Sequence, residues 1–563
     1  MSQITAEIIN LWSDLNPVAG YTGGHLEELT TLYIQNPGNV ETMRTRIHSL
    51  QKQLDEIKDN KLRTTADAVL VALKTQLDMV RPSGAGPSGT GMGGVYAAAD
   101  GIFYIVLKKD YKADYVPQYL EAVKEIIEFE TQKWQDQEFS ILVRKECLNT
   151  VDYMNGTLES LLIVRPEAKD QVDEIKVALE DYKNLFFVKD LDSDDFKTYW
   201  PIFQQWDEIA GPRLTPGYPA SLQNYYRFTQ TADEIETMAQ SWLELDLPVT
   251  IHITQRIAAL PFVGGGGSLQ EIWDKVSKQY AVDFSQWMEK VLKACNDFGS
   301  EYIIATTPED KVLFNATPGY LVNLVTGGED FAVDYLEGDK AYSQLYLTES
   351  KNTSLLTMIN ILVHEASHGY NFVLSAKNAV SPLLNLNTSL EVPMTEGMAF
   401  YREYQYWAAA QDLLGRSYLN DIQKNYLELY GSTPEDQEQG VLCAQLETYI
   451  WRVIRYIRTL CDVKVNGGKM TYTDFISWAA STTGLSEETL HGECFTLLSA
   501  PGYAPCYAVG GATYAMEQKK GIPAGKSEIE FNTFTSKQGF YAWPIAVELM
   551  NSYASGKTEG ESS

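Results

Sequence analysis

Residues 355–374 read LLTMINILVHEASHGYNFVL, and this stretch decides the fold expected for the chain of 563 residues. Apolar side chains fill nearly every position before the two histidines, which is typical of a helix buried on all sides. His364 to His368 form the pattern HExxH. Residues four apart share one helical face, so both imidazoles can converge on one metal ion. Buried imidazoles need polar partners, and a metal ion would satisfy both; a hydrogen-bonded core without metal is the alternative.

The histidine spacing leaves a third metal ligand to be found. In metzincins a glycine and a histidine follow the second histidine after three and six residues, but Asn371 and Leu374 occupy these positions. A glutamate on a following helix is then the expected ligand. We predict Glu396, which lies 28 residues after His368 in the segment EVPMTEGMAFYREYQYW, where Pro393 marks a helix start.

Two further glutamates of that segment compete for the role. Glu391 is one, and Glu403 is the other. Glu403 lies two helical turns from Glu396 on the same face, which suits a supporting contact to a ligand better than metal binding. Two histidines and one glutamate predict Zn²⁺ with an open position for water, as in catalytic sites. Glu365, beside the first histidine, would take a proton from the zinc-bound water.

Outward from this motif the sequence predicts a mainly α protein, a large helical ellipsoid with a deep cleft. Three- and four-residue apolar spacing runs through most of the chain, and Ser268 with Glu271 forms a capping-box pattern before one helix. Between about 300 and 348 the segments EYIIATT, KVLFNAT, GYLVNLV, FAVDYL and SQLYLT are short and rich in β-branched and aromatic residues. They predict a small antiparallel sheet or a set of hairpins just before the HExxH helix.

The same patterns divide the chain into regions. The segment PSGAGPSGTGMGGV predicts a plain loop, because no Lys-Ser or Lys-Thr pair follows it as in a phosphate loop. The expected regions are an N-terminal helical region at 1–81, a Gly/Ser/Pro-rich loop at 82–97, a helical region lining the cleft at 98–299, the β insert at 300–348, the catalytic helical region at 349–520, and a C-terminal segment with a disordered tail at 521–563.

Composition limits the partners that we expect. The formal net charge of −30 argues against nucleic acid and anionic membranes, although one cleft can differ from the whole surface. The chain contains no run of 18 uninterrupted apolar residues, so no transmembrane helix is expected. Its N-terminus lacks the pattern of a signal peptide. Six cysteines without a CxxC pair favour a reducing compartment, so a cytoplasmic location is expected. The sequence leaves the oligomeric state open.

Three motifs together resemble a known family. HEASH, TEGMAFYREY and the later APGYAPCYAVGG are similar to motifs of the domain-of-unknown-function 885 family, which contains metallopeptidase-like proteins related to the gluzincins. The resemblance covers roughly residues 15–520 and implies a zinc peptidase. The chain departs from the family in its shorter HExxH motif. It also lacks a family histidine near Asp462 and a family arginine near Glu493.

Several side chains near these motifs receive expected roles. By resemblance Tyr507 is the donor to the oxyanion, with Tyr503 and Tyr514 as alternatives, and Tyr503 is also expected to contact substrate. Arg455 and Arg458 share a helical face and could bind a substrate carboxylate, or they could form salt bridges that offset the acidic charge. His491 lies in a polar stretch, and we expect it to be solvated.

The function predicted from these observations is that of a zinc-dependent metallohydrolase, a peptidase that cleaves short peptides through Glu365-assisted attack of zinc-bound water. The missing family histidine and arginine motivate an alternative, a diverged metal-dependent amidase, lactonase or lyase acting on a non-peptide small molecule. A non-catalytic helical binding scaffold is the third hypothesis.

Overall fold

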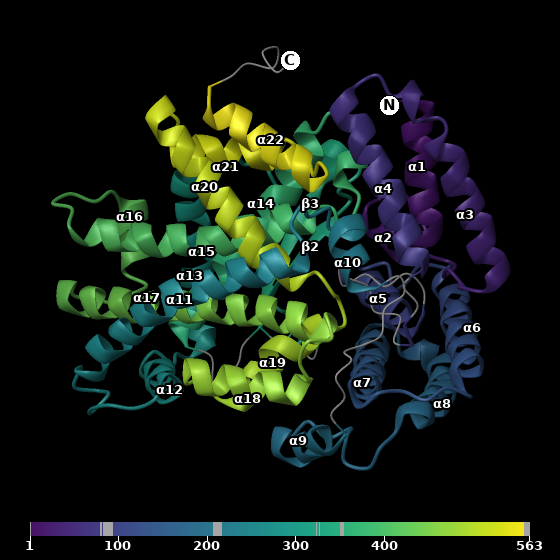
Figure 1. Cartoon of the computed structure of the whole chain (residues 1–563), viewed down its shortest axis with the longest axis horizontal. Helices are drawn as coiled ribbons and strands as arrows, with labels where there is room; N and C mark the ends of the chain where they lie inside the picture. The colour runs from purple at the N-terminus through teal and green to yellow at the C-terminus, as the bar shows by residue number, and fades with distance from the viewer. Residues whose placement is uncertain are drawn as a thin grey trace.

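The computed structural model describes residues 2–78, 81–82, 94–206, 217–322, 324–325, 327–348 and 354–556. Helices dominate these residues, and both described ends of the chain lie at the same end of the molecule (Figure 1). The mainly α class predicted from the sequence is confirmed. None of the described helices combines the length and the apolar character needed to cross a membrane.

The N-terminal part of the chain forms one side of the molecule in Figure 1. Tyr182, Phe186 and other apolar side chains of its helices are buried in the larger of two hydrophobic clusters. The helices of this side are α1 (Gln3–Leu15), α2 (Pro17–Thr22), α3 (Pro37–Gln51), α4 (Asn60–Asp78), α5 (Gly94–Leu107), α6 (Val116–Trp134), α7 (Ile141–Val164), α8 (Lys169–Phe186) and α9 (Phe196–Gln205).

The later helices form the other side and the centre. Ser268 and Glu271 form the predicted capping box at the start of α12. The helices are α10 (Tyr218–Ala220), α11 (Ala232–Ala258), α12 (Leu269–Gln279), α13 (Phe284–Phe298), α14 (Leu355–Asn378), α15 (Val392–Leu414), α16 (Asp421–Leu427), α17 (Pro434–Cys461), α18 (Tyr472–Thr483), α19 (Glu487–Leu498), α20 (Gly511–Gly521), α21 (Glu528–Lys537) and α22 (Trp543–Ala554).

A three-stranded sheet lies directly before α14 in sequence and against it in space. Its strands are β1 (Val312–Ala316), β2 (Gly328–Val333) and β3 (Tyr342–Leu347), in the order β1-β3-β2. β2 pairs antiparallel with β3, but β1 pairs parallel with it, so the prediction of an antiparallel sheet was wrong in this respect. The alternation of apolar and polar residues shows which face of a strand is buried, but it does not show which strand pairs with it. The direction of pairing could therefore not be predicted from the sequence.

Two segments that were expected in the β insert are not strands. Glu301 to Ile303 close the π-helical turn η4 (Gly299–Ile303), and residues 319–322 form turns. Short apolar runs are ambiguous between a strand and the end of a buried helix. Here the ring of Tyr302 packs against Phe298 of the preceding helix, with 4.9 Å between ring centroids, and this contact continues the helical path.

One region boundary also changes. Residues 94–97 of the expected 82–97 loop belong to α5, and residues 83–93 lie outside the described part of the chain. The C-terminal segment expected at 521–563 contains α21 and α22. Its last residues, 557–563, where a disordered tail was expected, lie outside the described residues.

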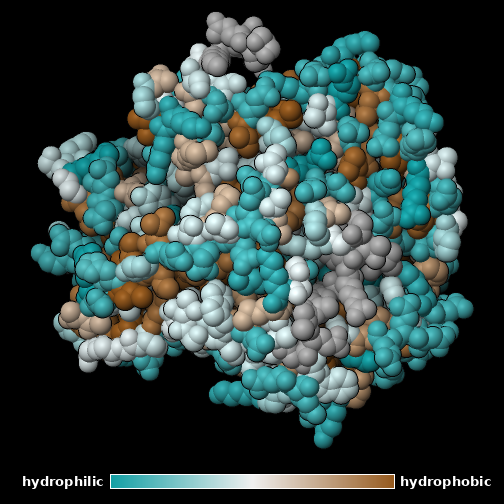
Figure 2. All heavy atoms as spheres, in the orientation of Figure 1, coloured by the Kyte–Doolittle hydropathy of each residue, from teal (hydrophilic) through white to brown (hydrophobic). Residues whose placement is uncertain are grey.

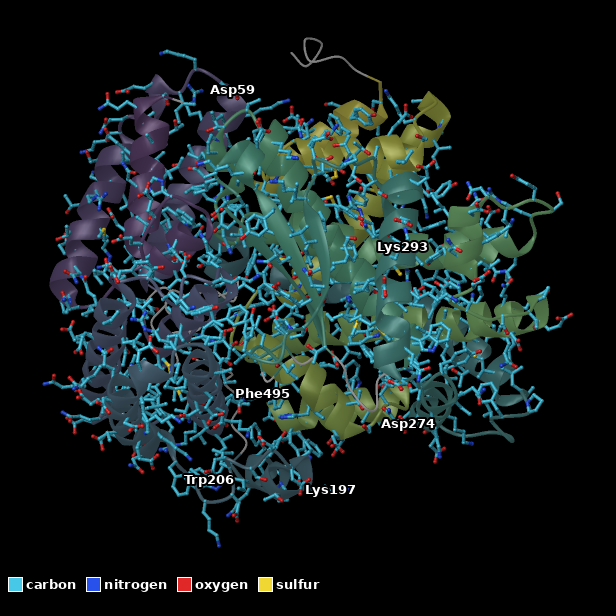
Figure 3. All side chains as sticks on the ribbon, turned by 180° about the vertical axis from the view of Figure 1, so that it is seen from behind. Asp59, Lys197, Trp206, Asp274, Lys293 and Phe495 are labelled. Atoms are coloured by element: carbon cyan, nitrogen blue, oxygen red, sulfur yellow. The ribbon has the colours of Figure 1, made fainter. Side chains whose placement is uncertain are left out.

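The HExxH helix α14 is packed on several sides. It begins at Ser354, whose hydroxyl accepts the backbone N–H of Thr357 at 3.0 Å, a standard N-cap. One face lies on the sheet so closely that a Cβ at Gly369 would fall 2.9 Å from an oxygen of Asp330. The helices α15, α17 and α21 cover other sides. Seen from behind, the sheet stands in the centre of the molecule, whereas Asp59 and Lys197 lie near the periphery (Figure 3).

The outer surface is mostly hydrophilic on the face in Figure 2, notably over the N-terminal helices. That distribution agrees with the formal net charge of −30. The two histidines of the motif lie instead in the interior, His364 being 7% exposed. Any chemistry at the motif therefore takes place inside the molecule.

Candidate metal centre

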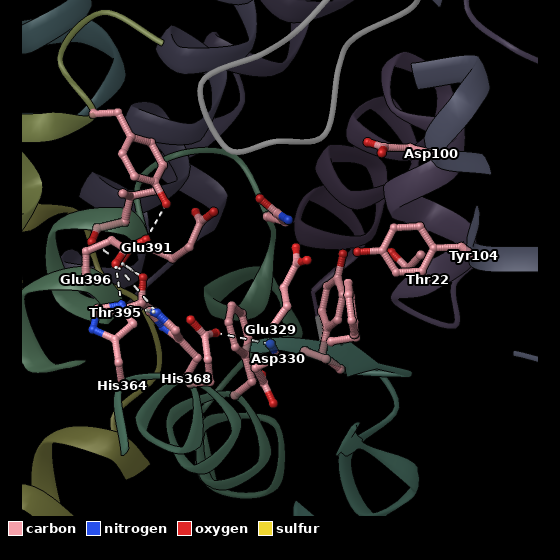
Figure 4. Close-up of a pocket in the computed structure, with 18 of the residues that line it drawn as sticks. Thr22, Asp100, Tyr104, Glu329, Asp330, His364, His368, Glu391, Thr395 and Glu396 are labelled. Atoms are coloured by element: carbon pink, nitrogen blue, oxygen red, sulfur yellow. Dashed lines mark hydrogen bonds and ion pairs between the residues drawn. The ribbon is translucent and has the colours of Figure 1, made fainter. Parts of the chain in front are cut away.

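Three side chains from α14 and α15 bring their polar atoms together inside the molecule (Figure 4). Nε2 of His364 lies 3.1 Å from Nε2 of His368. Oε2 of Glu396 lies 3.3 Å and 3.5 Å from these two nitrogens. Ligands at about 2.0–2.2 Å from a tetrahedral zinc ion lie roughly 3.4 Å from one another. The triangle formed by the three predicted ligands therefore has the size of a zinc ligand set.

One atom of this triangle lacks a hydrogen bond. Oε2 of Glu396 is buried, and no described residue donates a hydrogen bond to it. Burial alone would raise the pKa of Glu396, but His368 and His364 together lower it well below its usual value. A buried anionic oxygen without a donor is costly unless a cation accompanies it. The residues present thus fit a divalent metal ion, in agreement with the donor types that zinc prefers.

The other nitrogen of His364 is held by Glu403. Nδ1 of His364 lies 2.7 Å from Oε1 of this glutamate. Glu403 also binds Asn360 through Oε2, at 3.2 Å, and Arg455 through Oε1, at 2.5 Å. Fixing Nδ1 in this way orients the imidazole and leaves Nε2 for a metal ion. The position of Glu403 is that of the supporting residue expected from its spacing.

The ligand glutamate is also held from the C-terminal motif. The hydroxyl of Tyr503 donates a hydrogen bond to Oε1 of Glu396. Tyr503, which was expected to contact substrate, therefore also orients a candidate ligand. The backbone of Gly397 lies close to that of Gly510, in the π-helical turn η8 (Cys506–Gly510), and this close approach brings Tyr503 to Glu396. A Cβ added at Gly397 would lie only 2.5 Å from the carbonyl carbon of Gly510. The two motifs of the sequence meet at these glycines.

Gly397→Ala is expected to destabilise the protein by about 1–3 kcal/mol, since the added methyl group would meet fixed backbone of η8. The urea concentration at the midpoint of unfolding, followed by circular dichroism, measures the effect. Gly266→Ala is the matched control, because a Cβ there meets no atom within 4 Å. An unchanged midpoint in Gly397→Ala would contradict the close contact.

Glu365 points from α14 into a cavity of about 320 Å³ that also contains the ligand triangle. Its Oε2 accepts the backbone N–H of Asp330, on β2, at 3.1 Å. Burial raises the pKa of Glu365 to about 8, although neighbouring His364 lowers it. A cation in the triangle would lower this pKa further, because nearby positive charge favours the carboxylate. Glu365 is thus positioned to exchange protons with a group beside the triangle.

Tyr507 lines the same cavity. Its ring centroid lies 6.1 Å from that of His364, and no described residue forms a hydrogen bond with its hydroxyl. That hydroxyl is free to donate to a ligand in the cavity. Tyr514 is not an alternative, since it lies outside the cavity lining, is 1% exposed and donates to Asn532 at 2.6 Å.

The expected substrate-binding arginines lie outside the cavity lining that the structure describes. Arg455 binds Glu403, and Arg458 binds Glu493. Both arginines therefore form salt bridges, which was the alternative to binding a substrate carboxylate. Arg455 affects the site by holding Glu403, which contacts His364.

The expectation that His491 is solvated was wrong. It is 4% exposed and enclosed by aromatic rings that include those of α9 and α19, and burial lowers its pKa to about 3.

Comparisons with known proteins show likeness in fold alone. No protein-family model and no curated protein matches the sequence. A solved structure described as "putative lipoprotein" from Colwellia psychrerythraea is similar over 99% of both chains, with a TM-score of 0.64 and 11% identity. A "putative lipoprotein of unknown function" from Shewanella oneidensis gives a TM-score of 0.61 and 13% identity over 97% of this chain and 99% of that one. The family resemblance suggested by the three motifs stays a prediction.

Sequence reasoning missed the other carboxylates of the cavity. Asp100 comes from α5, and Glu329 with Asp330 comes from β2. Neither segment carries a recognisable motif. The only signal was an acidic pair, Glu329 and Asp330, at the start of a strand that would otherwise be apolar.

Proposed function

We propose that this protein is a zinc-dependent metallohydrolase that cleaves short peptides. The observation that carries the proposal is the buried triangle of His364, His368 and Glu396, with one glutamate oxygen that no described residue satisfies. The cavity of about 320 Å³ supports a small substrate, since ligand sites commonly begin near 300 Å³. The support of Nδ1 by Glu403 adds the outer contact that zinc-binding histidines usually have.

The chain's own residues suggest how hydrolysis would proceed. When bound, zinc would supply Lewis acidity, which lowers the pKa of water and polarises a carbonyl group. Glu365 would take the proton of the attacking water and deliver it to the leaving amine. Its contact with the N–H of Asp330 holds one carboxylate oxygen, which leaves the other for this proton. The hydroxyl of Tyr507 would donate to the oxyanion that develops on the substrate.

Metal analysis of the purified protein tests the proposal. We expect about one zinc ion per chain, as in mononuclear catalytic sites. The zinc-loaded protein should cleave a mixture of short peptides. Treatment with 1,10-phenanthroline should abolish this cleavage, and addition of zinc should restore it. Undiminished cleavage by protein freed of metal would contradict the proposal, and so would failure to retain any divalent ion after incubation with zinc.

A further inference from the structure

The cavity beside the candidate metal centre is lined by an unusual excess of acidic side chains. Among the described lining residues there is no lysine or arginine, and the only basic groups are the two motif histidines. The carboxylates that line it are Asp100, Glu329, Asp330, Glu365, Glu391 and Glu396. Like charges gathered in one enclosed space repel one another unless protons or a cation compensate them.

These carboxylates are not needed for a second metal ion. Within the described residues only His364, His368 and Glu396 bring ligand atoms together as a metal site requires. Glu391 is occupied otherwise, because its Oε2 accepts the backbone N–H groups of Thr388 and Ser389, at 3.1 Å and 2.9 Å. The acidic excess at the other end of the cavity therefore calls for a different cation.

Glu329 occupies the middle of the cavity. Figure 4 shows its side chain between the ligand triangle on one side and Asp100 with Tyr104 on the other. Its carboxylate forms no hydrogen bond or ion pair with a described residue, and the residue is exposed to solvent. Desolvation by the protein around the open cavity raises its pKa to about 7. A cationic ligand would give this group a partner of opposite charge, which a neutral or anionic ligand would not.

Asp100 forms the far end of the cavity. It is 5% exposed, and its Oδ1 accepts the hydroxyl of Tyr153 at 2.9 Å. Burial raises the pKa of Asp100 well above its usual value, and the negative charge of Glu329 raises it further. Both carboxylates line the same cavity, and a positive charge between them would stabilise the charged form of each.

A buried oxygen without a donor also marks the histidine end of this cavity as a ligand site. Oε2 of Glu396, a side chain that is 6% exposed, lacks a described hydrogen-bond donor at the histidine end. Native proteins rarely leave buried polar atoms unsatisfied unless a ligand or ion completes them.

The wall beside Asp100 and Glu329 is aromatic. Tyr96 and Tyr153 stack with 5.3 Å between ring centroids, and Tyr104 stands next to them on α5. Aromatic faces attract ammonium and guanidinium groups, more so where water is excluded. Carboxylates together with tyrosine rings form the kind of surface that recognises an organic cation.

We propose that the cavity selects substrates that carry a positive charge, and that this ammonium or guanidinium group binds between Glu329 and Asp100 against the tyrosine rings. The inference rests on the proposed function for the place of the scissile bond, at the histidine end. The substrates would then be short peptides with a basic side chain, or with a free amino terminus, close to the bond that is cleaved.

Binding to the full chain carrying Glu365→Gln tests the charge preference without turnover. Calorimetry compares acetyl-Ala-Lys-Ala-amide with its Nε-acetyllysine counterpart, and Ala-Ala-Ala-amide with its N-acetylated form. In at least one pair the charged peptide should bind at least about tenfold more tightly than its acetylated form. A preference in the lysine pair identifies a side-chain cation, and a preference in the alanine pair identifies an amino-terminal one. Dissociation constants equal to within about twofold in both pairs would overturn the inference.

Two substitutions locate the cation. Glu329→Gln and Asp100→Asn, each added to Glu365→Gln, should reduce the preference by about fivefold or more and leave binding of the neutral peptide unchanged. Glu289→Gln is the matched control, since it removes the same charge from an exposed position on α13. If Asp100→Asn does not fold, Glu329→Gln still decides, because its side chain forms no hydrogen bond with a described residue. A full preference in folded Glu329→Gln would contradict the site.

Failure of this inference and failure of the proposed function give different results. Charge preference in a protein that holds no zinc and cleaves no peptide would contradict the hydrolase and leave the cation site standing. Zinc-dependent cleavage without charge preference would overturn the cation site alone.

Discussion

Glu365→Gln is expected to lower kcat for the proposed peptide cleavage by about 10²–10⁴-fold and to leave zinc binding intact, because the substitution removes the proposed general base and spares the candidate ligands. The change is nearly isosteric. The amide oxygen of glutamine can still accept the N–H of Asp330. The fold around α14 should therefore persist, and the loss should appear in the proton-transfer step.

The measurement has two parts, the zinc content and the rate of cleavage of one short peptide at saturating concentration. Glu289→Gln serves again as the control, since it makes the same chemical change far from the cavity and should retain full activity. Cleavage at the wild-type rate by zinc-loaded Glu365→Gln would remove this residue from the role of base.

His364→Ala is expected to reduce zinc affinity by more than about 100-fold, the upper range for loss of a merely supporting residue. Two candidate ligands would remain, His368 and Glu396, too few for a closed zinc shell. The fold should survive, because the buried pair of Glu403 and Arg455 does not depend on the imidazole.

Zinc content after dialysis and the melting temperature with and without zinc measure this second effect. An ion that binds only the folded state stabilises it by about 4 kcal/mol at 1,000 times its dissociation constant. Wild type should therefore melt at a higher temperature with zinc, and His364→Ala should not respond. His48→Ala removes an exposed histidine of α3 and should behave as wild type. Stoichiometric zinc in His364→Ala would contradict the ligand set.

The part of the site that is local in sequence could be predicted from it. The two histidines are four residues apart on one helix, so their convergence follows from helical geometry. Glu396 and Glu403 are seven apart on the next helix, so one could face the triangle while the other supported it. The structure places them in this way, with Glu403 on Nδ1 of His364.

The part that depends on distant contacts could not be predicted. Asp100 precedes the motif by more than 260 residues, and only packing of α5 beside the sheet brings it to the cavity. His491 was misjudged for the same reason, because its own stretch is polar and the rings that bury it include those of α9. The parallel pairing of β1 with β3 likewise has no signature in either strand.

The cavity draws residues from α5, β2, α14, α15 and the turn that carries Tyr507, so it exists only when distant segments have docked. During synthesis both histidines leave the ribosome before Glu396 and Tyr503. A nascent chain could then hold an ion only loosely, and peptide cleavage would wait until the last helices pack. Contacts of high sequence separation slow folding, because the long loop between the partners has to be closed first. The moment at which zinc is taken up during refolding would therefore report when the last segments assemble. Fragments that end before residue 503 should remain inactive.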